Sequence, residues 1–463
     1  MTEFRTGLDR PRTVRRVARP RTWSVRASDV IAVLVANGVL IVLMWLLHGG
    51  AADLGSPSGI LTAAGQLTAL FGTYLVLIEL VLMSRSPWLE QSFGMDRLAA
   101  VHRWIGFGCV VLLVGHGVLT TTGYALGDGR SIVGEAGVLL TTYPFVLWAT
   151  VGMALFVGVA VSSMRVARRR LSYETWHGIH LYAYLAVALT FAHQLVVGAD
   201  FATDPLARSY WIGLYLLTAA TILLFRFGLP VRTSLRHRLR VANVVVEGPG
   251  VVSIYLTGRD LDQLAVRSGQ YLVCRFLVRD GWWRAHPFSI SAAPNGDWLR
   301  LTVKDLGDDS ERLQDIPLGT PVYVEGPYGA LTGARRTKAR VLLVAGGIGI
   351  TPLRALLEEL PGGPGELALI YRTRREADLV FRSEIDAIAR LRGATVHYLV
   401  GARGSWDLAA EPLGPDALAR LVPDVVERDV FLCGPTPMMD AVRRSLRLLG
   451  VAADQIHSER FVY

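Results

Sequence analysis

The sequence predicts a multidomain membrane protein, in which a six-helix transmembrane bundle is followed by a small antiparallel β-barrel and a doubly wound α/β domain. The chain has 463 residues, of which 51% are hydrophobic, and its mean hydropathy is +0.37. It is too long for one compact domain and too apolar for an ordinary soluble protein. The apolar residues are concentrated before about residue 230, and shorter strand-like segments broken by Gly, Pro and charged residues follow, so we place a boundary near residue 235.

Six apolar stretches predict the bundle, because roughly 20 apolar residues form a helix that crosses about 30 Å of hydrocarbon. They lie near residues 28–48, 60–83, 98–122, 143–163, 174–198 and 209–229. We expect four parts along the chain, namely a basic segment at 1–27, the helical bundle at 28–232, the barrel at 237–335 and the α/β domain at 338–463.

Positive charge gathers in alternate loops of the predicted bundle. One side carries the arginines between Arg5 and Arg26, Arg85, Arg97, Arg165, Arg168, Arg169, Arg170, Arg232, Arg236 and Arg238, whereas the other holds only Arg130 and Arg208 beside several acidic residues. Since positive loops are retained in the cytosol, we expect six spans in the plasma (inner) membrane with both termini cytoplasmic. The basic start is expected to be a retained segment, because no clear cleavage site follows the first apolar run.

Charge and cysteine content exclude several function classes. The formal net charge is +9, but the arginines cluster at span ends, which favours anionic lipid over nucleic acid as the partner. The three cysteines form no CxxC pair, so neither a disulfide framework nor a zinc or iron–sulfur site is indicated. No protein partner is evident from the sequence.

Histidines at two matched depths of spans three and five are the strongest candidates for function. Span three carries His102 and His116, and span five carries His177, His180 and His193. An imidazole in hydrocarbon is costly unless it is paired or ligating. The fourteen-residue step on span three rises about 21 Å, and the thirteen-residue step from His180 to His193 rises about 20 Å. Two stacked haems therefore fit across the bilayer.

We assign His102 with His180 to the inner haem and His116 with His193 to the outer one, with His177 as the competing inner ligand. Two neutral imidazoles saturate haem iron, which is typical of an electron carrier. Fourteen residues return a helix to within about 40° of its starting face, whereas thirteen leave it about 140° away. Span five is therefore expected to need a bulge, a tilt or different ligand rotamers.

A glycine-rich turn marks a nucleotide site in the predicted α/β domain. The segment VLLVAGG ends in Gly346 and Gly347. Gly349, Thr351 and Pro352 follow, and a helical run begins there. Glycines let a pyrophosphate approach the backbone, and the helix N-terminus supplies free N–H groups and a positive dipole end. Proline suits the first turn of such a helix.

Two further segments of this domain are expected to contact the nucleotide. Arg372 and Arg374 follow the next strand, where an acidic residue would suit a free ribose 2'-hydroxyl and Arg suits a 2'-phosphate, so NADPH is favoured over NADH. A solvated basic loop is the alternative. Cys433, Gly434 and Pro435 end another parallel strand at the carboxyl edge, where ligands bind, and a buried structural cysteine is the alternative for Cys433.

These motifs together resemble the NADPH oxidase and ferric reductase transmembrane superfamily, whose soluble half is related to ferredoxin-NADP reductase. The resemblance rests on the segment from His286 to Ser291, on GGIGITP, on CGPTPMM and on the histidine spacing, and it covers nearly the whole chain beyond the first 25 or so residues.

The resemblance implies an FAD-binding barrel. It assigns the flavin to His286, Pro287, Phe288, Ser289 and Ser291, and to Val303, Lys304 and Ser310 in TVKDLGDDSERL. Asp308 and Asp309 depart from the family pattern, in which glycines are commoner at these places.

The resemblance also implies a catalytic ring at the C-terminus, two residues after a glutamate and stacked on the flavin. Glu459 and Phe461 have that spacing, and Tyr463 is the reserve. With Cys433, they are the expected catalytic residues.

The expected activity is electron transfer from cytosolic NADPH through FAD and two b-type haems to an extracytoplasmic acceptor. A closed iron implies outer-sphere transfer, and oxygen, giving superoxide or hydrogen peroxide, and a ferric chelate are both compatible acceptors. A rival from another class is a transporter or sensor whose membrane histidines bind a metal ion and whose soluble half senses nucleotide.

Overall fold

The structure, a computed structural model, describes residues 25–198, 204–305, 307–401 and 412–459. These residues form two compact units. The helical unit consists of Val25–Leu89 and Arg97–Arg226, and the mixed unit contains Glu90–Asp96 and the chain from Phe227 onward.

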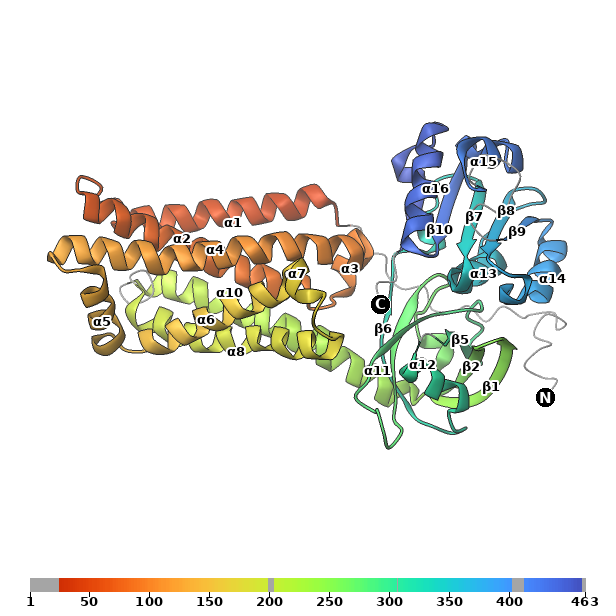
Figure 1. The fold of residues 1–463 in the computed structure, drawn as a ribbon, viewed down its shortest axis with the longest axis horizontal. Helices are drawn as coiled ribbons and strands as arrows, with labels where there is room; N and C mark the ends of the chain where they lie inside the picture. Colours follow the sequence, from red (N-terminus) through yellow and green to blue (C-terminus); the bar gives the residue numbers. More distant parts are fainter. Residues whose placement is uncertain (1–24, 199–203, 306, 402–411, 460–463) are drawn as a thin grey trace. The chain divides into compact units, whose positions relative to one another are not determined.

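Long helices make up almost all of the helical unit (Figure 1). They are α1 (Ala27–Leu47), α2 (Pro57–Leu82), α4 (Met95–Asp128), α6 (Val146–Ser163), α8 (Tyr173–Val197) and α10 (Pro205–Ile222), with the shorter α3 (Pro87–Phe93), α5 (Ile132–Thr142) and α7 (Arg165–Arg168) in the connections. A π-helical turn, Leu223–Gly228, leads from α10 into α11 (Leu229–His237). Among the described residues, six helices are long and apolar enough to cross a membrane, which confirms the six predicted spans.

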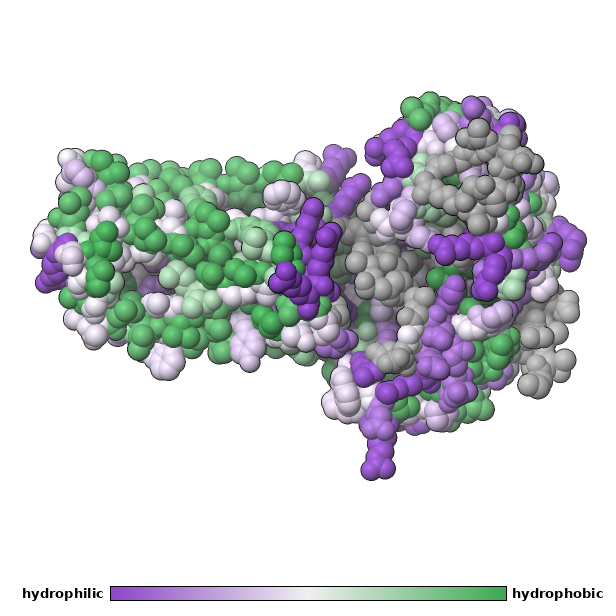
Figure 2. All heavy atoms as spheres, in the orientation of Figure 1, coloured by the Kyte–Doolittle hydropathy of each residue, from purple (hydrophilic) through white to green (hydrophobic). Residues whose placement is uncertain are grey.

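Local sequence signals explain where these helices begin. Ser56, Ser172 and Asp204 each precede a helix and accept hydrogen bonds from backbone N–H groups of the first turn. Such N-caps satisfy donors that have no partner within the helix. The outer face is apolar (Figure 2), with Trp104 80% and Val111 69% exposed. Since such a surface is unfavourable in water and suited to hydrocarbon, the helical unit has the surface of a transmembrane bundle.

The first part of the mixed unit is built from six antiparallel strands. They are β1 (Arg240–Gly248), β2 (Val251–Thr257), β3 (Tyr271–Phe276), β4 (His286–Ser289), β5 (Leu299–Lys304) and β6 (Val322–Tyr328). They form two three-stranded sheets, β1-β2-β5 and β4-β3-β6, around one shared apolar core. Among the described residues, the isolated bridges Arg240–Pro321 and Ile290–Leu301 and a few backbone hydrogen bonds join the two sheets without a continuous strand ladder, so the predicted barrel is not confirmed.

The second part of the mixed unit is a five-stranded parallel sheet, as predicted. Its strands are β7 (Arg340–Gly346), β8 (Leu367–Thr373), β9 (Thr395–Val400), β10 (Arg428–Cys433) and β11 (Ile456–Ser458), in the order β11-β10-β7-β8-β9. Two separate apolar clusters cover it, one with α13 (Ile350–Glu359) and α14 (Arg382–Arg392), the other with α15 (Pro415–Leu421) and α16 (Thr436–Leu448). The strand order reverses between β7 and β10, which makes this a doubly wound sheet with its switch point there.

A buried ion network joins the antiparallel part to the parallel part. Arg300 on β5, whose side chain is only 2% exposed, donates to both carboxylate oxygens of Glu384 on α14 at 2.9 and 3.1 Å. Arg354 on α13 lies 3.0 Å from the same carboxylate. Burial by itself raises the pKa of the Glu384 carboxyl, but the two guanidinium groups outweigh it and hold that pKa below its usual value. The carboxylate is therefore charged at neutral pH.

Glu384→Ala should lower the free energy of unfolding of the mixed unit by about 3 kcal/mol, because it leaves the buried Arg300 guanidinium without its carboxylate and Arg354 with Glu358 alone. Thermal unfolding of the full chain, followed by tryptophan fluorescence, measures the effect. Glu376→Ala is the matched control, since its ion pair with Arg382 has side chains 73% and 48% exposed and should contribute under about 1 kcal/mol. Because the folded-state pKa of Glu384 is lowered, the difference between wild type and Glu384→Ala should hold above about pH 4.3 and shrink as the pH falls further. Equal effects of the two substitutions would contradict this view of the network.

Candidate functional site

Two histidine pairs lie between α4 and α8. The ring centroids of His102 and His180 are 5.9 Å apart, and those of His116 and His193 are 6.2 Å apart. The pairs join the residues that the sequence assigned to each other. His177, the competing inner ligand, has its ring beside Trp176 instead, with the centroids 6.5 Å apart. The arrangement therefore supports His180 as the inner partner of His102.

In each of the four rings, Nδ1 already faces a neighbour. Nδ1 of His116 donates to the Gly65 carbonyl at 3.0 Å, and that of His193 to the Thr190 carbonyl at 3.2 Å. A carbonyl only accepts, so these nitrogens carry the proton and Nε2 keeps a lone pair. Nδ1 of His102 contacts a carboxylate oxygen of Glu79, and Nδ1 of His180 lies 3.5 Å from the Ser163 hydroxyl. Within the described ranges, Nε2 of these four histidines has no hydrogen-bond partner.

The approach of α2 to α4 at Gly65 positions the outer pair. A Cβ atom at Gly65 would lie 2.4 Å from Oγ1 and 3.0 Å from the backbone nitrogen of Thr120 on α4. Only glycine leaves room for this contact, which brings the Gly65 carbonyl within hydrogen-bond distance of His116. Thr120, one turn after His116, also places Oγ1 3.2 Å from the same Nδ1. The ring is thus held from both helices.

This donor set fits two six-coordinate haems. With metal–nitrogen bonds of about 2 Å, two imidazoles on opposite sides of one ion have centroids about 6 Å apart. Both pairs match that spacing. Ligating histidines characteristically use the second ring nitrogen to donate to a carboxylate or carbonyl, as His116 and His193 do here, and Nδ1 of His102 contacts a carboxylate. No group of three or more His, Cys, Asp or Glu that suits a bare metal ion occurs among the described residues.

The thirteen-residue step on span five does not require a bulge. Helix α8 is a continuous α-helix from Tyr173 to Val197, and both His180 and His193 still meet their partners on α4. Of the three expected solutions, tilt and ligand rotamers remain.

The switch point of the parallel sheet brings together the two motifs expected to bind nucleotide. Gly346 ends β7 and Cys433 ends the adjacent β10, with Ala345 paired to Cys433 in the ladder. A 3₁₀ turn, Gly347–Gly349, then leads into α13, where Thr351 and Pro352 form the first turn. The N-terminus of α13 therefore lies at the edge where nucleotides bind in such sheets.

Close packing at this edge depends on Gly349. A Cβ atom there would lie 2.4 Å from the carbonyl oxygen of Cys433 and 2.8 Å from the backbone nitrogen of Gly434. Cys433 is fully buried, and burial, with Glu459 nearby, raises the pKa of its thiol, which is therefore neutral at pH 7. The geometry supports the alternative reading of Cys433 as a buried structural residue, since a buried thiol neither reacts as a thiolate nor reaches a ligand.

The arginines after β8 differ in whether their guanidinium groups already have a partner in the protein. Arg372 donates to the Gly401 carbonyl at 3.1 Å, and Arg375 forms an ion pair with Asp378 at 2.8 Å. Arg374 is exposed, and no partner for it occurs in the described part of the chain. Arg374 is thus the guanidinium best placed to take a phosphate.

The predicted flavin segment is divided between the surface and the core. His286 and Phe288 on β4 stack with centroids 5.9 Å apart, and burial, with Arg284 nearby, lowers the pKa of His286. Ser291 is fully buried, accepts from Thr302 at 2.7 Å and donates to the Arg300 carbonyl at 3.1 Å. Val303 is 1% exposed inside the core. The side chains of Ser291 and Val303 are thus committed to the protein interior.

Ser310 makes local contacts rather than an open phosphate cradle. Its hydroxyl donates to the Gly307 carbonyl at 2.8 Å and lies 3.3 Å from an oxygen of Asp305. It belongs to the five-residue helix α12 (Asp308–Arg312). Lys304, at the end of β5, is partly exposed and available to an anion.

Two buried glutamates flank the turn after β6. The carboxylate of Glu459 packs against Gly329, where an added Cβ would lie 2.9 Å from Oε2. Glu90 accepts hydrogen bonds from the Gly329 N–H at 3.0 Å and the Tyr271 hydroxyl at 3.2 Å. Phe461 and Tyr463, the predicted stacking rings, lie outside the described residues.

Sequence reasoning missed Glu79, Gly65, Thr120 and Ser163 as supports of the histidines. Glu79 carried a signal, because an acidic residue inside a span is costly and by default functional. No sequence signal indicated the roles of Gly65, Thr120 and Ser163, since small residues are common in transmembrane helices.

Three family matches divide the chain. Residues 68–191 match the ferric reductase like transmembrane component, residues 236–332 an FAD-binding domain and residues 343–444 the oxidoreductase NAD-binding domain. This is the domain composition of an oxidoreductase integral to a membrane. It bears out the resemblance found from the motifs.

About half of the chain matches curated relatives. It is 28% identical over 243 residues to the glycine betaine monooxygenase reductase subunit of Chromohalobacter salexigens, covering 50% of this chain and 65% of that protein. It is 30% identical over 243 residues to the flavohemoprotein of Chromobacterium violaceum (48% and 59%) and 33% identical over 236 residues to the ferredoxin reductase component of 3-ketosteroid-9-alpha-monooxygenase of Mycolicibacterium smegmatis (48% and 65%). The chain thus spans less than two thirds of the length of each.

Solved structures cover a similar share of the chain. The FAD/NAD binding domain of nitric oxide dioxygenase from Vibrio cholerae aligns with 22% identity and a TM-score of 0.39, covering 49% of this chain and 99% of that one. The cytochrome b5 reductase domain of Ulva prolifera nitrate reductase aligns with 21% identity and a TM-score of 0.41, covering 49% and 98%.

Gly349→Ala should weaken NADPH binding roughly tenfold, because the new methyl group forces the ends of β7 and β10 apart. Calorimetric titration of the purified protein with NADPH measures the affinity. Gly363→Ala is the control, since a Cβ there meets its nearest neighbour only at 3.8 Å. Unchanged affinity in Gly349→Ala would show that this close contact does not shape the nucleotide site.

Proposed function

This chain has the domain composition of the NADPH oxidase and ferric reductase superfamily, and we propose that it carries electrons from cytosolic NADPH through FAD and two b-type haems to an acceptor across the membrane. The observation that carries the proposal is the pairing of four histidines at two depths of α4 and α8, 5.9 and 6.2 Å between ring centroids. Such pairs saturate haem iron from both sides and suit electron transfer.

When bound, NADPH supplies a hydride, FAD divides its two electrons and each haem carries one at a time. His102 and His180 would hold the inner haem, and His116 and His193 the outer one. Their Nδ1 contacts orient the imidazoles, so that Nε2 of each ring would be free to bind the metal.

The mixed unit would hold FAD and the nucleotide. His286, Pro287, Phe288 and Ser289 on β4, with Lys304, are the residues proposed for FAD. Ser310 is a weaker candidate because its hydroxyl already donates to the Gly307 carbonyl. No side-chain contact with FAD is proposed for Ser291 and Val303, because both side chains are buried. Gly346, Gly347 and Gly349 with the first turn of α13, together with Gly434 and Pro435, are proposed for the pyrophosphate.

Residues near the C-terminus are proposed to border the flavin. Glu459 is buried against Gly329 and would limit access of water and protons there. Phe461, two residues further on, is proposed as the ring that nicotinamide displaces, with Tyr463 in reserve. Cys433 would contribute its backbone and its packing rather than a reactive thiolate, because its thiol is buried and neutral.

The proposed orientation has both termini in the cytosol of a plasma (inner) membrane. The arginine-rich loops support it through the retention of positive charge. The boundaries near residues 27, 232–237 and 335–338 are proposed as the limits of the basic segment, the haem domain, the FAD domain and the NAD(P)H domain.

Oxygen, giving superoxide or hydrogen peroxide, is the acceptor we propose. With two histidines proposed for each haem, electrons would reach oxygen without its binding to iron, so the proposal needs no substrate pocket. The match to a ferric reductase like component favours a ferric chelate as the second candidate.

The decisive experiment is anaerobic addition of NADPH to the purified, haem-loaded full-length chain. A reduced b-type absorption band should appear, and subsequent addition of oxygen or ferric citrate should reoxidise it. A folded preparation without porphyrin would contradict the proposal and favour a metal-binding transporter or sensor with a nucleotide-sensing half.

His116→Ala should remove one of two haems, because the outer iron loses one of its two ligands. The haem-to-protein ratio from a pyridine extract, together with the FAD content as a folding control, measures this. His177→Ala should keep both haems, since its ring lies outside the two pairs. Two haems in His116→Ala, or one in His177→Ala, would refute the ligand assignment.

Arg374→Ala should raise the KM for NADPH about tenfold and leave the KM for NADH within about twofold, because a charge-assisted contact to the 2'-phosphate is lost. Steady-state reduction of a dye by the two nucleotides measures the ratio. Arg375→Ala is the control, since Asp378 already engages its guanidinium. Equal effects on both nucleotides would remove the case for a 2'-phosphate site.

A further inference from the structure

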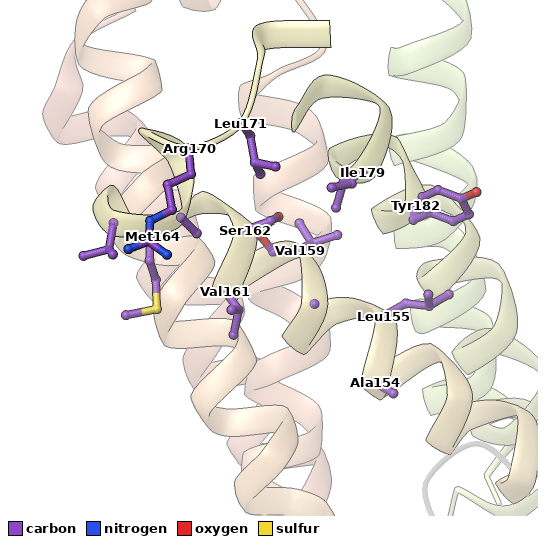
Figure 3. Close-up of a pocket in the computed structure, with 13 residues that line it drawn as sticks. Ala154, Leu155, Val159, Val161, Ser162, Met164, Arg170, Leu171, Ile179 and Tyr182 are labelled. Atoms are coloured by element: carbon purple, nitrogen blue, oxygen red, sulfur yellow. Dashed lines mark hydrogen bonds between the residues drawn. The ribbon is translucent and has the colours of Figure 1, made fainter. Parts of the chain in front are cut away.

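The helical unit contains an open pocket of about 650 Å³ whose lining includes none of the paired histidines (Figure 3). It is lined by α6, α7, α8 and the short connection between the last two, and its volume lies in the range of about 300–1,000 Å³ typical of ligand pockets. Most of its lining is aliphatic, including Leu155, Val159 and Ile179. Such a wall suits a hydrocarbon chain.

Arg170 lines one side of the pocket, and three more arginines lie within five residues of it in the chain. Figure 3 shows the side chain of Arg170 beside Met164 at one side, with Tyr182 from α8 at the other. Residues 164–173 contain four arginines and no acidic residue. Arg165, Arg169 and Arg170 are exposed, and no partner for any of them occurs among the described residues. These guanidinium groups stand at the end of an apolar helix, where a headgroup would lie.

The fourth arginine, Arg168, has a different role. Its guanidinium stacks over the Trp176 ring at 4.8 Å, and Trp176 packs 5.0 Å from the His180 ring. Trp176 also donates to the Ser163 hydroxyl at 3.3 Å. Arg168 thus ties α7 to the start of α8, which holds the pocket wall in place while the other three arginines face outward.

We propose that this pocket binds an anionic phospholipid, with an acyl chain along the aliphatic wall of α6 and α8 and the phosphate at Arg165, Arg169 and Arg170. Charge complementarity selects this occupant, since basic pockets between transmembrane helices bind anionic headgroups and each basic residue adds to that attraction. A neutral apolar ligand would use the wall but not the arginines.

The test uses the haem-loaded full-length chain in detergent, stripped of lipid and titrated with phosphatidylglycerol or with phosphatidylcholine of identical acyl chains. Native mass spectrometry counts bound lipid per chain. Wild type should bind one phosphatidylglycerol at least about tenfold more tightly than phosphatidylcholine, and Arg169→Gln with Arg170→Gln should remove that preference. The double variant Arg26→Gln with Arg97→Gln, which also removes two exposed arginines at helix ends, should keep it.

A second variant tests the acyl wall without altering charge. Gly158 lines the pocket, and an added Cβ there meets no atom within 4 Å, so Gly158→Leu should fill the pocket without disturbing α6. It should lower the affinity for both lipids at least tenfold and leave the haem spectrum unchanged. Gly213→Leu on α10, where a Cβ also meets nothing within 4 Å, is the matched control and should bind as wild type does.

Three results would overturn the proposal. One is equal binding of phosphatidylglycerol by wild type, by the Arg169→Gln, Arg170→Gln double variant and by Gly158→Leu. Another is displacement of bound lipid by millimolar inorganic phosphate, which would identify a free anion as the ligand. The third is a quinone in the organic extract of wild type that is lost in Gly158→Leu, which would identify a neutral occupant.

Discussion

The contact made by Nδ1 of each paired membrane histidine determines how its ring is oriented in the helical unit. A histidine in hydrocarbon is stable only when both nitrogens are used, and here a neighbour at Nδ1 leaves Nε2 for a metal. The supports for the first pair come from other helices, Glu79 on α2 and Ser163 on α6. Helices α2 and α6, which carry no predicted ligand, therefore fix the orientation of the rings on α4 and α8.

The outer pair shows the same dependence on backbone approach. His116 is oriented by a carbonyl of α2, and that carbonyl is within reach only because residue 65 has no side chain. His193 instead uses the carbonyl of Thr190 in its own helix. One ring is thus positioned by helix packing and the other by local helical geometry, so a change in α2 should disturb His116 far more than His193.

The parts of this protein that sequence predicts best are those with local causes. Apolar length predicts the six spans, and alternation of strands with glycine-rich turns predicts the parallel sheet, because each signal lies within one segment. Matched depth on two helices predicted the histidine pairs, but depth alone did not identify the supporting helices. Closure of the antiparallel part depends on pairing between distant edges, where the described residues form isolated bridges and a few backbone hydrogen bonds rather than a continuous ladder. Sequence offers no local signal for such pairing.

Side-chain direction limits which residues of the predicted flavin motif can contact a ligand through their side chains. Along β5, Leu299, Leu301 and Val303 all face the core, so the alternation of a strand places Val303 inside whatever its position in a motif. Ser291 is drawn inward by hydrogen bonds to the same strand. A family motif identifies a stretch of chain, and the pleat of the strand then decides which of its side chains can touch a ligand.

The ion network of Arg300, Glu384 and Arg354 has a consequence for the proposed chemistry. Apolar interfaces tolerate sliding, whereas a bidentate guanidinium–carboxylate pair is directional, and its burial makes any misaligned state costly. The pair joins the strand that leads to the flavin segment to the helix that follows β8. Hydride transfer requires reacting atoms within about 3–3.5 Å, and misplacement by about 1 Å can cost about a hundredfold in rate. A directional buried contact between the two halves of the mixed unit is therefore better suited to that reaction than an apolar surface of equal stability.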